Sequence, residues 1–322
     1  MRDMRIAFLA ITLAAAGCGG GGGGTASAPS VPMPTNTPGS AATMSLSISI
    51  PFAATTTSAS ARTPQYVSNG TQALAVYDGA TLLYVGNLIL TTPPGFVSPP
   101  VYQKTGSTTV TPGSCTRGNL ASTCTLTVTT TTGPHTFGLT AYGQFQGGFV
   151  LPGSVARKVD DIGTPPTFTG LILSEGQASM TAVGGVNPAQ TITLLGVADI
   201  AQWFGPQTAS FNQTATIGYI IQDARSGQIV TPGTTYDNGP VTITASPSGI
   251  LTFTPVSQTT PPSTNGSQTF DVTCTSGSGG LVTFTAGAGT QPNTAWASGL
   301  TYSSSNYSNG TLSTRTFRCF GS

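Results

Sequence analysis

Charged side chains are scarce in this 322-residue chain: they make up 6% of the residues, and the formal net charge is +1. A typical soluble protein carries about 25% charged residues. Binding to nucleic acid depends on clustered lysines and arginines that neutralise phosphates, and the sequence contains no such cluster. The composition therefore argues against nucleic acid as a partner, and it does not imply any other partner that is bound through charge.

Side chains for acid–base and nucleophilic chemistry are equally rare. His135 is the only histidine and Glu175 the only glutamate. No G-x-S-x-G elbow accompanies the histidine, and no glycine motif for phosphate or dinucleotide binding is present. Most Asp residues occupy turn sequences such as Asp78-Gly79 and Asp237-Asn238-Gly239, and His135 lies in the turn Gly133-Pro134-His135, so turn formation explains them. We therefore expect no catalytic residue, no cofactor and no enzyme activity.

Potential metal ligands are not grouped along the chain. Zinc sites usually take Cys or His in close pairs such as C-x2-C, and the sequence has no such pair. The adjacent Asp160 and Asp161, in the charged stretch 157–166, suggest a cation site, but a solvated linker explains them as well. We therefore expect no metal site.

The N-terminus has the pattern of an export signal. Two arginines precede the apolar run 6–16, which is shorter than the about 20 residues needed to span a bilayer. The run ends in LAAAGC at residues 13–18, and small residues directly before Cys18 resemble a bacterial lipobox, with Ala15 where Leu is usual. The resemblance implies that residues 1–17 are a lipoprotein signal peptide and that Cys18 carries the lipid. The alternative is an ordinary signal peptide, with Cys18 incidental.

A flexible tether follows the proposed lipid site. Six glycines come directly after Cys18, and a segment rich in Pro and Ser continues to residue 42. Such sequences form flexible or extended chain, which suits a leash of residues 18–42 between a membrane and a folded body. Gly19 rather than Asp follows the cysteine, and by resemblance to the sorting rules of diderm bacteria this implies the outer membrane or cell surface. The expected membrane contact is through the N-terminal lipid.

The remaining chain has the signature of strands. Gly and Pro are abundant, as many short turns require, and apolar residues alternate with Ser or Thr over 44–52 and 124–129. Asp78-Gly79 lies between two apolar runs and predicts a hairpin. Only Asp199–Phe204 suggests a short helical turn. The pattern predicts an all-β fold of two β-sandwiches, residues 43–165 and 166–322.

Two segments resemble known proteins. The turn sequence DARSG at 223–227 is similar to a D-x-x-G turn of bacterial immunoglobulin-like domains. The stretch 62–72, followed by Cys115, Cys124 and a Gly-x-x-x-Phe strand at 133–137, resembles a recurrent pattern in uncharacterised surface lipoproteins of environmental diderm bacteria. The resemblance would cover most of residues 45–290. It implies two immunoglobulin-like β-sandwiches and no known activity.

Five cysteines occur, and four remain if Cys18 is acylated. An even number in an exported protein predicts disulfides, although three pairings are possible. We expect Cys115–Cys124 and Cys274–Cys319, because each of these pairs lies within one predicted domain.

These features predict a lipid-anchored cell-envelope protein with a structural, adhesive or binding role and an unidentified protein or glycan partner. The alternative is a carbohydrate-binding surface module in which Trp203 and Trp296 stack on sugars. We favour the structural interpretation of both tryptophans, with one Trp in the core of each sandwich or in a loop packed on its edge.

Overall fold

The computed structural model describes residues 39–51, 68, 70–89, 94–98, 100–117, 121–146, 157–159, 168–229, 235–254, 257–258, 267–288, 300–302 and 311–322. Throughout these ranges the chain forms strands and turns and no helix, which confirms the predicted all-β fold. The signal peptide, Cys18, the tether to residue 38, Asp160, Asp161 and Trp296 lie outside the described residues.

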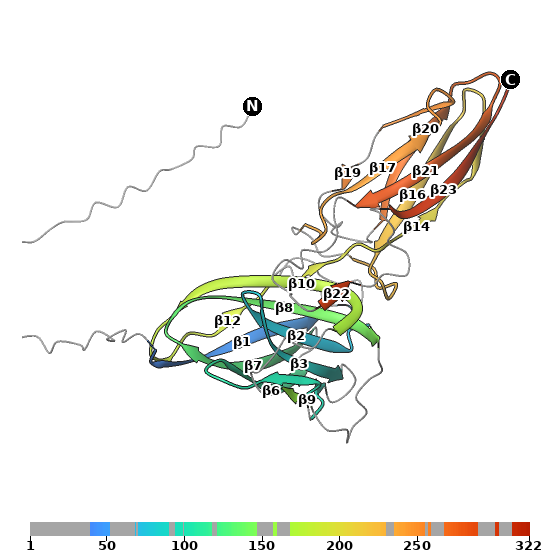
Figure 1. Ribbon diagram of the computed structural model, residues 1–322. Coiled ribbons are helices and arrows are strands. Elements are labelled where there is room, and N and C mark those ends of the chain that lie inside the picture. The colour runs from blue at the N-terminus through green and yellow to red at the C-terminus, as the bar shows by residue number, and fades with distance from the viewer. Residues whose placement is uncertain are drawn as a thin grey trace, which may run out of the picture. The chain divides into compact units, whose positions relative to one another are not determined.

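One layer of the first sandwich is a five-stranded sheet around the strand nearest the N-terminus (Figure 1). Its strands are β1 (Ala41–Pro51), β6 (Thr109–Arg117), β7 (Ala121–Thr131), β11 (Gly185–Val186) and β12 (Gln190–Thr191). β1 pairs antiparallel with β7 along its whole length and parallel with β11 and β12 on its other side. The predicted alternation is confirmed here, because Met44, Leu46 and Ile48 are buried while the Ser and Thr between them are partly exposed.

The second layer is a nine-stranded sheet. Its main path is β13 (Leu195–Gly196), β10 (Phe168–Ala182), β8 (Gly133–Gln146), β2 (Ala73–Asp78), β3 (Thr81–Ile89), β5 (Tyr102–Lys104) and β9 (Arg157–Val159). β22 (Leu300–Tyr302) adds to β10, and β4 (Gly95–Phe96) adds to β3. β2 and β3 form the hairpin predicted at Asp78-Gly79, and Gly79 has the positive φ of 54° that this turn requires.

The first core lies between these two sheets. Apolar side chains of β1 and β7, such as Leu46 and Leu126, meet Val76, Phe137 and Leu139 from the nine-stranded sheet. A separate buried cluster lies on the opposite face of that sheet. Both faces of β2 and β3 are therefore covered, which explains why consecutive residues of each strand are buried.

Two further sheets form the second sandwich. One contains β14 (Ile200–Phe204), β16 (Thr214–Gln222), β20 (Ser267–Cys274) and β18 (Leu251–Phe253). The other contains β15 (Thr208–Ser210), β23 (Thr311–Phe320), β21 (Gly280–Ala288), β17 (Val241–Ser246) and β19 (Ser257–Gln258). Their shared core is rich in aromatic rings, with Phe284 in edge contact with Phe253, Phe270 and Phe317.

Strand pairing moves the boundary between the sandwiches away from the predicted position at 165/166. β10 is antiparallel to β8, β13 pairs with β10, and β11 and β12 pair with β1. Residues 168–196 therefore complete the first sandwich, and the strands of the second begin at Ile200. The sequence pattern does not predict a strand over 168–182. Because β10 belongs to the first sandwich, the predicted boundary lies too early in the chain.

A second correction concerns residues 199–204, where the sequence suggested a helical turn. Residues 200–204 instead form β14, and each of them pairs with a residue of β16. Ala201 is buried and Trp203 half-buried, whereas Gln202 is exposed, so the segment has the two-residue period of a strand.

Both predicted disulfides are present. Cys115–Cys124 joins β6 to β7, where the two residues are also direct register partners. Cys274–Cys319 joins β20 of one sheet to β23 of the other, and so links the two layers of the second sandwich. Disulfides persist in oxidising compartments, so this pair of bridges indicates an exported protein.

Candidate functional site

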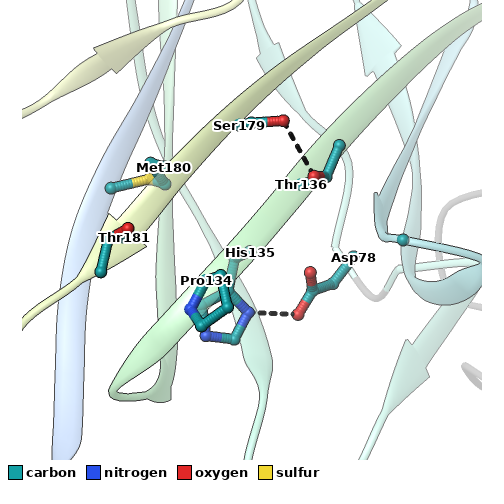
Figure 2. Close-up of a pocket in the computed structure, with 8 residues that line it drawn as sticks. Asp78, Pro134, His135, Thr136, Ser179, Met180 and Thr181 are labelled. Atoms are coloured by element: carbon teal, nitrogen blue, oxygen red, sulfur yellow. Dashed lines mark hydrogen bonds and ion pairs between the residues drawn. The ribbon is translucent and has the colours of Figure 1, made fainter.

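An open depression lies at one edge of the first sandwich, where the β2–β3 turn meets the start of β8 and the outer side of β10 (Figure 2). Asp78 and Gly79 come from the turn, Pro134 to Thr136 from β8, and Ser179 to Thr181 from β10. The register explains the gathering, because Asp78 pairs with Phe137 and Met180 pairs with His135. Three strands thus bring polar side chains from distant sequence positions to one place.

His135 is held from both sides of its ring. Its Nδ1 lies 2.7 Å from Oδ2 of Asp78, as the dashed line in Figure 2 shows, and its Nε2 lies 2.9 Å from the carbonyl oxygen of Thr131. A carbonyl oxygen can only accept, so Nε2 carries a hydrogen. The two contacts of the ring tie the start of β8 to the β2–β3 turn.

This geometry is unsuited to a catalytic triad. A general base needs a ring nitrogen aimed at a hydroxyl that a substrate can reach. The hydroxyl of Thr130 lies 3.4 Å from Nε2, but Thr130 is buried and its hydroxyl bonds to that of Thr108 at 2.9 Å. Ser179, which does line the depression, is hydrogen bonded to Thr136 (2.9 Å). His135 and Asp78 therefore form a turn clamp in this arrangement.

A carboxyl pair, formed by the buried Glu175 and the partly exposed Asp237, is the feature that sequence reasoning missed. Glu175 of β10 is fully buried, and the hydroxyl of Thr140 on β8 donates to its Oε1 at 3.2 Å. Burial, followed by the charge and hydrogen bond of Asp237, raises the pKa of Glu175 to about 9. Two carboxyl groups in contact cannot both ionise readily, so Glu175 holds its proton at neutral pH.

Asp237 is brought to this pair by a turn that is anchored through its backbone and its neighbour. Its N–H donates to the carbonyl oxygen of Gly196 at 3.0 Å. The side chain of Asn238 accepts from the N–H of Ala198 (3.0 Å) and donates to the carbonyl oxygen of the same residue (2.7 Å). The sequence explained Asp237-Asn238-Gly239 as turn chemistry alone, and only the pairing of distant strands shows that the turn faces Glu175.

Trp203 has an internal role. It packs against the second core, with its ring centroid 5.7 Å from that of Tyr219 and 6.3 Å from that of Phe284. Its indole N–H donates to the hydroxyl of Ser313 at 2.8 Å. A sugar-stacking platform requires an accessible ring face with free flanking groups, so this geometry favours the core interpretation of Trp203. Trp296, the other predicted contact, lies outside the described residues.

A second basic clamp occurs in the second sandwich. Arg315 of β23 points inward, and its guanidinium donates to the carbonyl oxygens of Phe204 (2.7 Å) and Pro206 (2.8 Å). Burial lowers the pKa of Arg315, but the side chain remains a cation because an arginine pKa starts so high. The residue satisfies carbonyl groups where the chain leaves β14, and its role is structural.

The part of the chain that the structure describes contains no group of three or more His, Cys, Asp or Glu side chains placed to hold a metal ion. The same residues include no helix able to cross a membrane. No protein-family model matches the chain, and a comparison with curated proteins finds no match.

Proposed function

We propose that the chain is a lipid-anchored protein of the bacterial cell envelope, held through Cys18, with a structural, adhesive or binding role. The observation that carries this proposal is the combination of three features: a lipobox-like LAAAGC, a glycine leash, and a body of two β-sandwiches that each contain one disulfide. Oxidised cysteines place the body outside the cytoplasm, and the leash supplies reach from a membrane.

The described polar sites support binding or structure better than catalysis. Each candidate group is already used inside the fold: His135 with Asp78 and Thr131, Glu175 with Thr140 and Asp237. The position of Gly19 after the acylated cysteine favours the outer membrane as the location. Protease treatment of intact cells would then separate a surface-exposed body, which is cut, from one that faces the periplasm, which is protected.

The anchor is tested by detergent-phase partition of the full chain. We expect the native protein to enter the detergent phase and Cys18→Ser to move to the aqueous phase, because the lipid supplies the apolar anchor. Cys115→Ser combined with Cys124→Ser is the matched control, since it removes two cysteines but leaves residue 18, and it should stay in the detergent phase. A Cys18→Ser protein that remains with the detergent contradicts the proposal.

A further inference from the structure

The outer face of β7 is made of threonine. Leu126, Val128 and Thr130 point inward and are buried, and the threonines between them, at 125, 127 and 129, lie on the solvent side. The alternation that identifies the strand thus places a hydroxyl at every second residue. Alternate residues are about 6.6–6.8 Å apart along a strand.

The neighbouring strands continue this pattern in register. Thr109 and Thr111 of β6 pair with Thr129 and Thr127, and on the other side Thr43 and Ser45 of β1 pair with the same two residues. Adjacent strands lie about 4.8 Å apart. The strands β6, β7 and β1 lie side by side in the five-stranded sheet (Figure 1). Their outward Ser and Thr side chains, which we call the hydroxyl face, therefore form a grid of rows that each cross three strands.

The hydroxyl face is neutral and has no aromatic residue. The ranges 41–48, 109–116 and 123–131 contain no charged residue and no Phe, Tyr or Trp. The exposed Val186 of β11, beside Thr43, is an apolar neighbour at the edge. The five-stranded sheet of the second sandwich differs, because its outer face carries the exposed Leu281 and Arg318, the latter over the ring of Phe320.

The grid is also fixed in place. The Cys115–Cys124 bridge joins β6 and β7 covalently, and β1 is paired on both of its sides. Threonine is branched at Cβ, which restricts its side-chain rotamers before any ligand arrives. Binding to such a surface costs less conformational entropy than binding to flexible side chains.

We propose that the hydroxyl face binds an extended neutral polysaccharide. Hydroxyl groups both donate and accept hydrogen bonds, as sugar hydroxyls do, and the spacing between strands is close to the length of a pyranose ring. The absence of charge disfavours anionic polymers, and the polar grid disfavours lipid or a buried protein interface. The inference rests on the proposed binding role and specifies its ligand. It places the carbohydrate site on the hydroxyl face of the first sandwich instead of at the tryptophans.

The test uses the full-length protein, purified in detergent, and two insoluble probes: microcrystalline cellulose and a linear β-1,3-glucan. The variant carries Thr109→Val, Thr111→Val, Thr127→Val and Thr129→Val, which remove four hydroxyls and keep the branched shape. Each lost hydrogen bond lowers affinity modestly, so together they should weaken binding at least about tenfold. Thr→Ser at the same four positions should retain binding, because it keeps the hydroxyls.

The chain offers a matched control on the other sandwich. Thr283 pairs with Thr316 and Thr285 with Thr314, so four threonines of β21 and β23 form the same square beside Leu281 and Arg318. Their Thr→Val variant should bind like the native protein. Absence of native binding to both glucans, equal loss in both variants, or preferential binding to heparin would overturn the inference. Failure of the anchor would appear separately, in the detergent partition of Cys18→Ser.

Discussion

The two sandwiches use their disulfides in different ways. In the first, Cys115–Cys124 joins strands that are already paired in the same sheet. In the second, Cys274–Cys319 crosses between the two sheets and closes a separation of 45 residues. A bridge within a sheet reinforces existing hydrogen bonds, whereas a bridge between layers replaces a contact that only side-chain packing would otherwise maintain.

The interiors differ as well. The second core is a cluster of aromatic rings around Phe284. The first sandwich buries Glu175 near Tyr77 and Tyr142, and burial raises the pKa of both tyrosines. The first sandwich thus contains an acid that keeps its proton at neutral pH because it is buried, whereas the second relies on the packing of aromatic rings. Chemical and thermal denaturation can test these two contributions separately.

The largest expected effect is loss of the disulfide between layers. Replacing both Cys274 and Cys319 by Ser should destabilise the second sandwich by about 4 kcal/mol, and replacing both Cys115 and Cys124 should destabilise the first by about 2.7 kcal/mol, because the longer loop leaves more freedom in the unfolded chain. Denaturant unfolding, followed by hydrogen exchange in each sandwich, measures the two losses. A larger loss from the Cys115 and Cys124 variant would show that loop length does not govern the difference.

The second expected effect is a dependence of stability on pH that originates at Glu175 of the first sandwich. The pKa of Glu175 is raised from its ordinary 4.5 to about 9, so between these values the unfolded chain releases a proton that the folded chain keeps. Stability is therefore greatest below pH 4.5 and falls as the pH rises through this window, by at most about 1.4 kcal/mol per pH unit.

Unfolding at pH 5, 7 and 8.5 checks this slope. Glu175→Gln should flatten it, because the amide cannot ionise and can still accept the hydrogen bond from Thr140. Asp237→Asn should reduce it in part, since it removes the neighbouring charge but not the burial. An unchanged slope in Glu175→Gln would assign the pH dependence to another group.

The smallest expected effects concern the two basic clamps. Arg315→Met leaves buried carbonyl groups of the second sandwich without a donor and should cost about 2 kcal/mol. His135→Gln removes the partly buried contact between His135 and Asp78 from the first sandwich and should cost about 1 kcal/mol. A double-mutant cycle of His135→Gln with Asp78→Asn isolates the pair energy in thermal unfolding. Additive losses in that cycle would mean that the two side chains act independently.

Much of the fold could be predicted from local patterns. Alternation identified β1 and β7, the Asp78-Gly79 turn identified the first hairpin, and the cysteine positions led to both disulfides. The failure at β10 has a physical cause: Ile172, Leu173, Ser174 and Glu175 are all buried, so this part of the strand shows no alternation. Glu175 is a neutral acid inside a sheet, and alternating exposure begins only after it.

The candidate sites were less predictable, because they depend on pairing between distant residues. His135 and Asp78 are separated by 57 positions, and each was explained as part of its own turn. The same limit applied to Asp237 and Glu175. Trp203 had two interpretations in the sequence, and only the position of Ser313 on β23 showed that its N–H is used internally.

The position of β1 has a mechanical consequence. It is the first strand that the structure describes, and antiparallel hydrogen bonding to β7 extends over all of Ala41–Pro51, with β11 and β12 on its other edge. A pulling force applied at Ala41 along the strand axis loads this ladder in shear, so many hydrogen bonds must break at once instead of one after another. A body tethered from its N-terminal side would therefore resist drag from flowing liquid through a strand that is paired along its whole length.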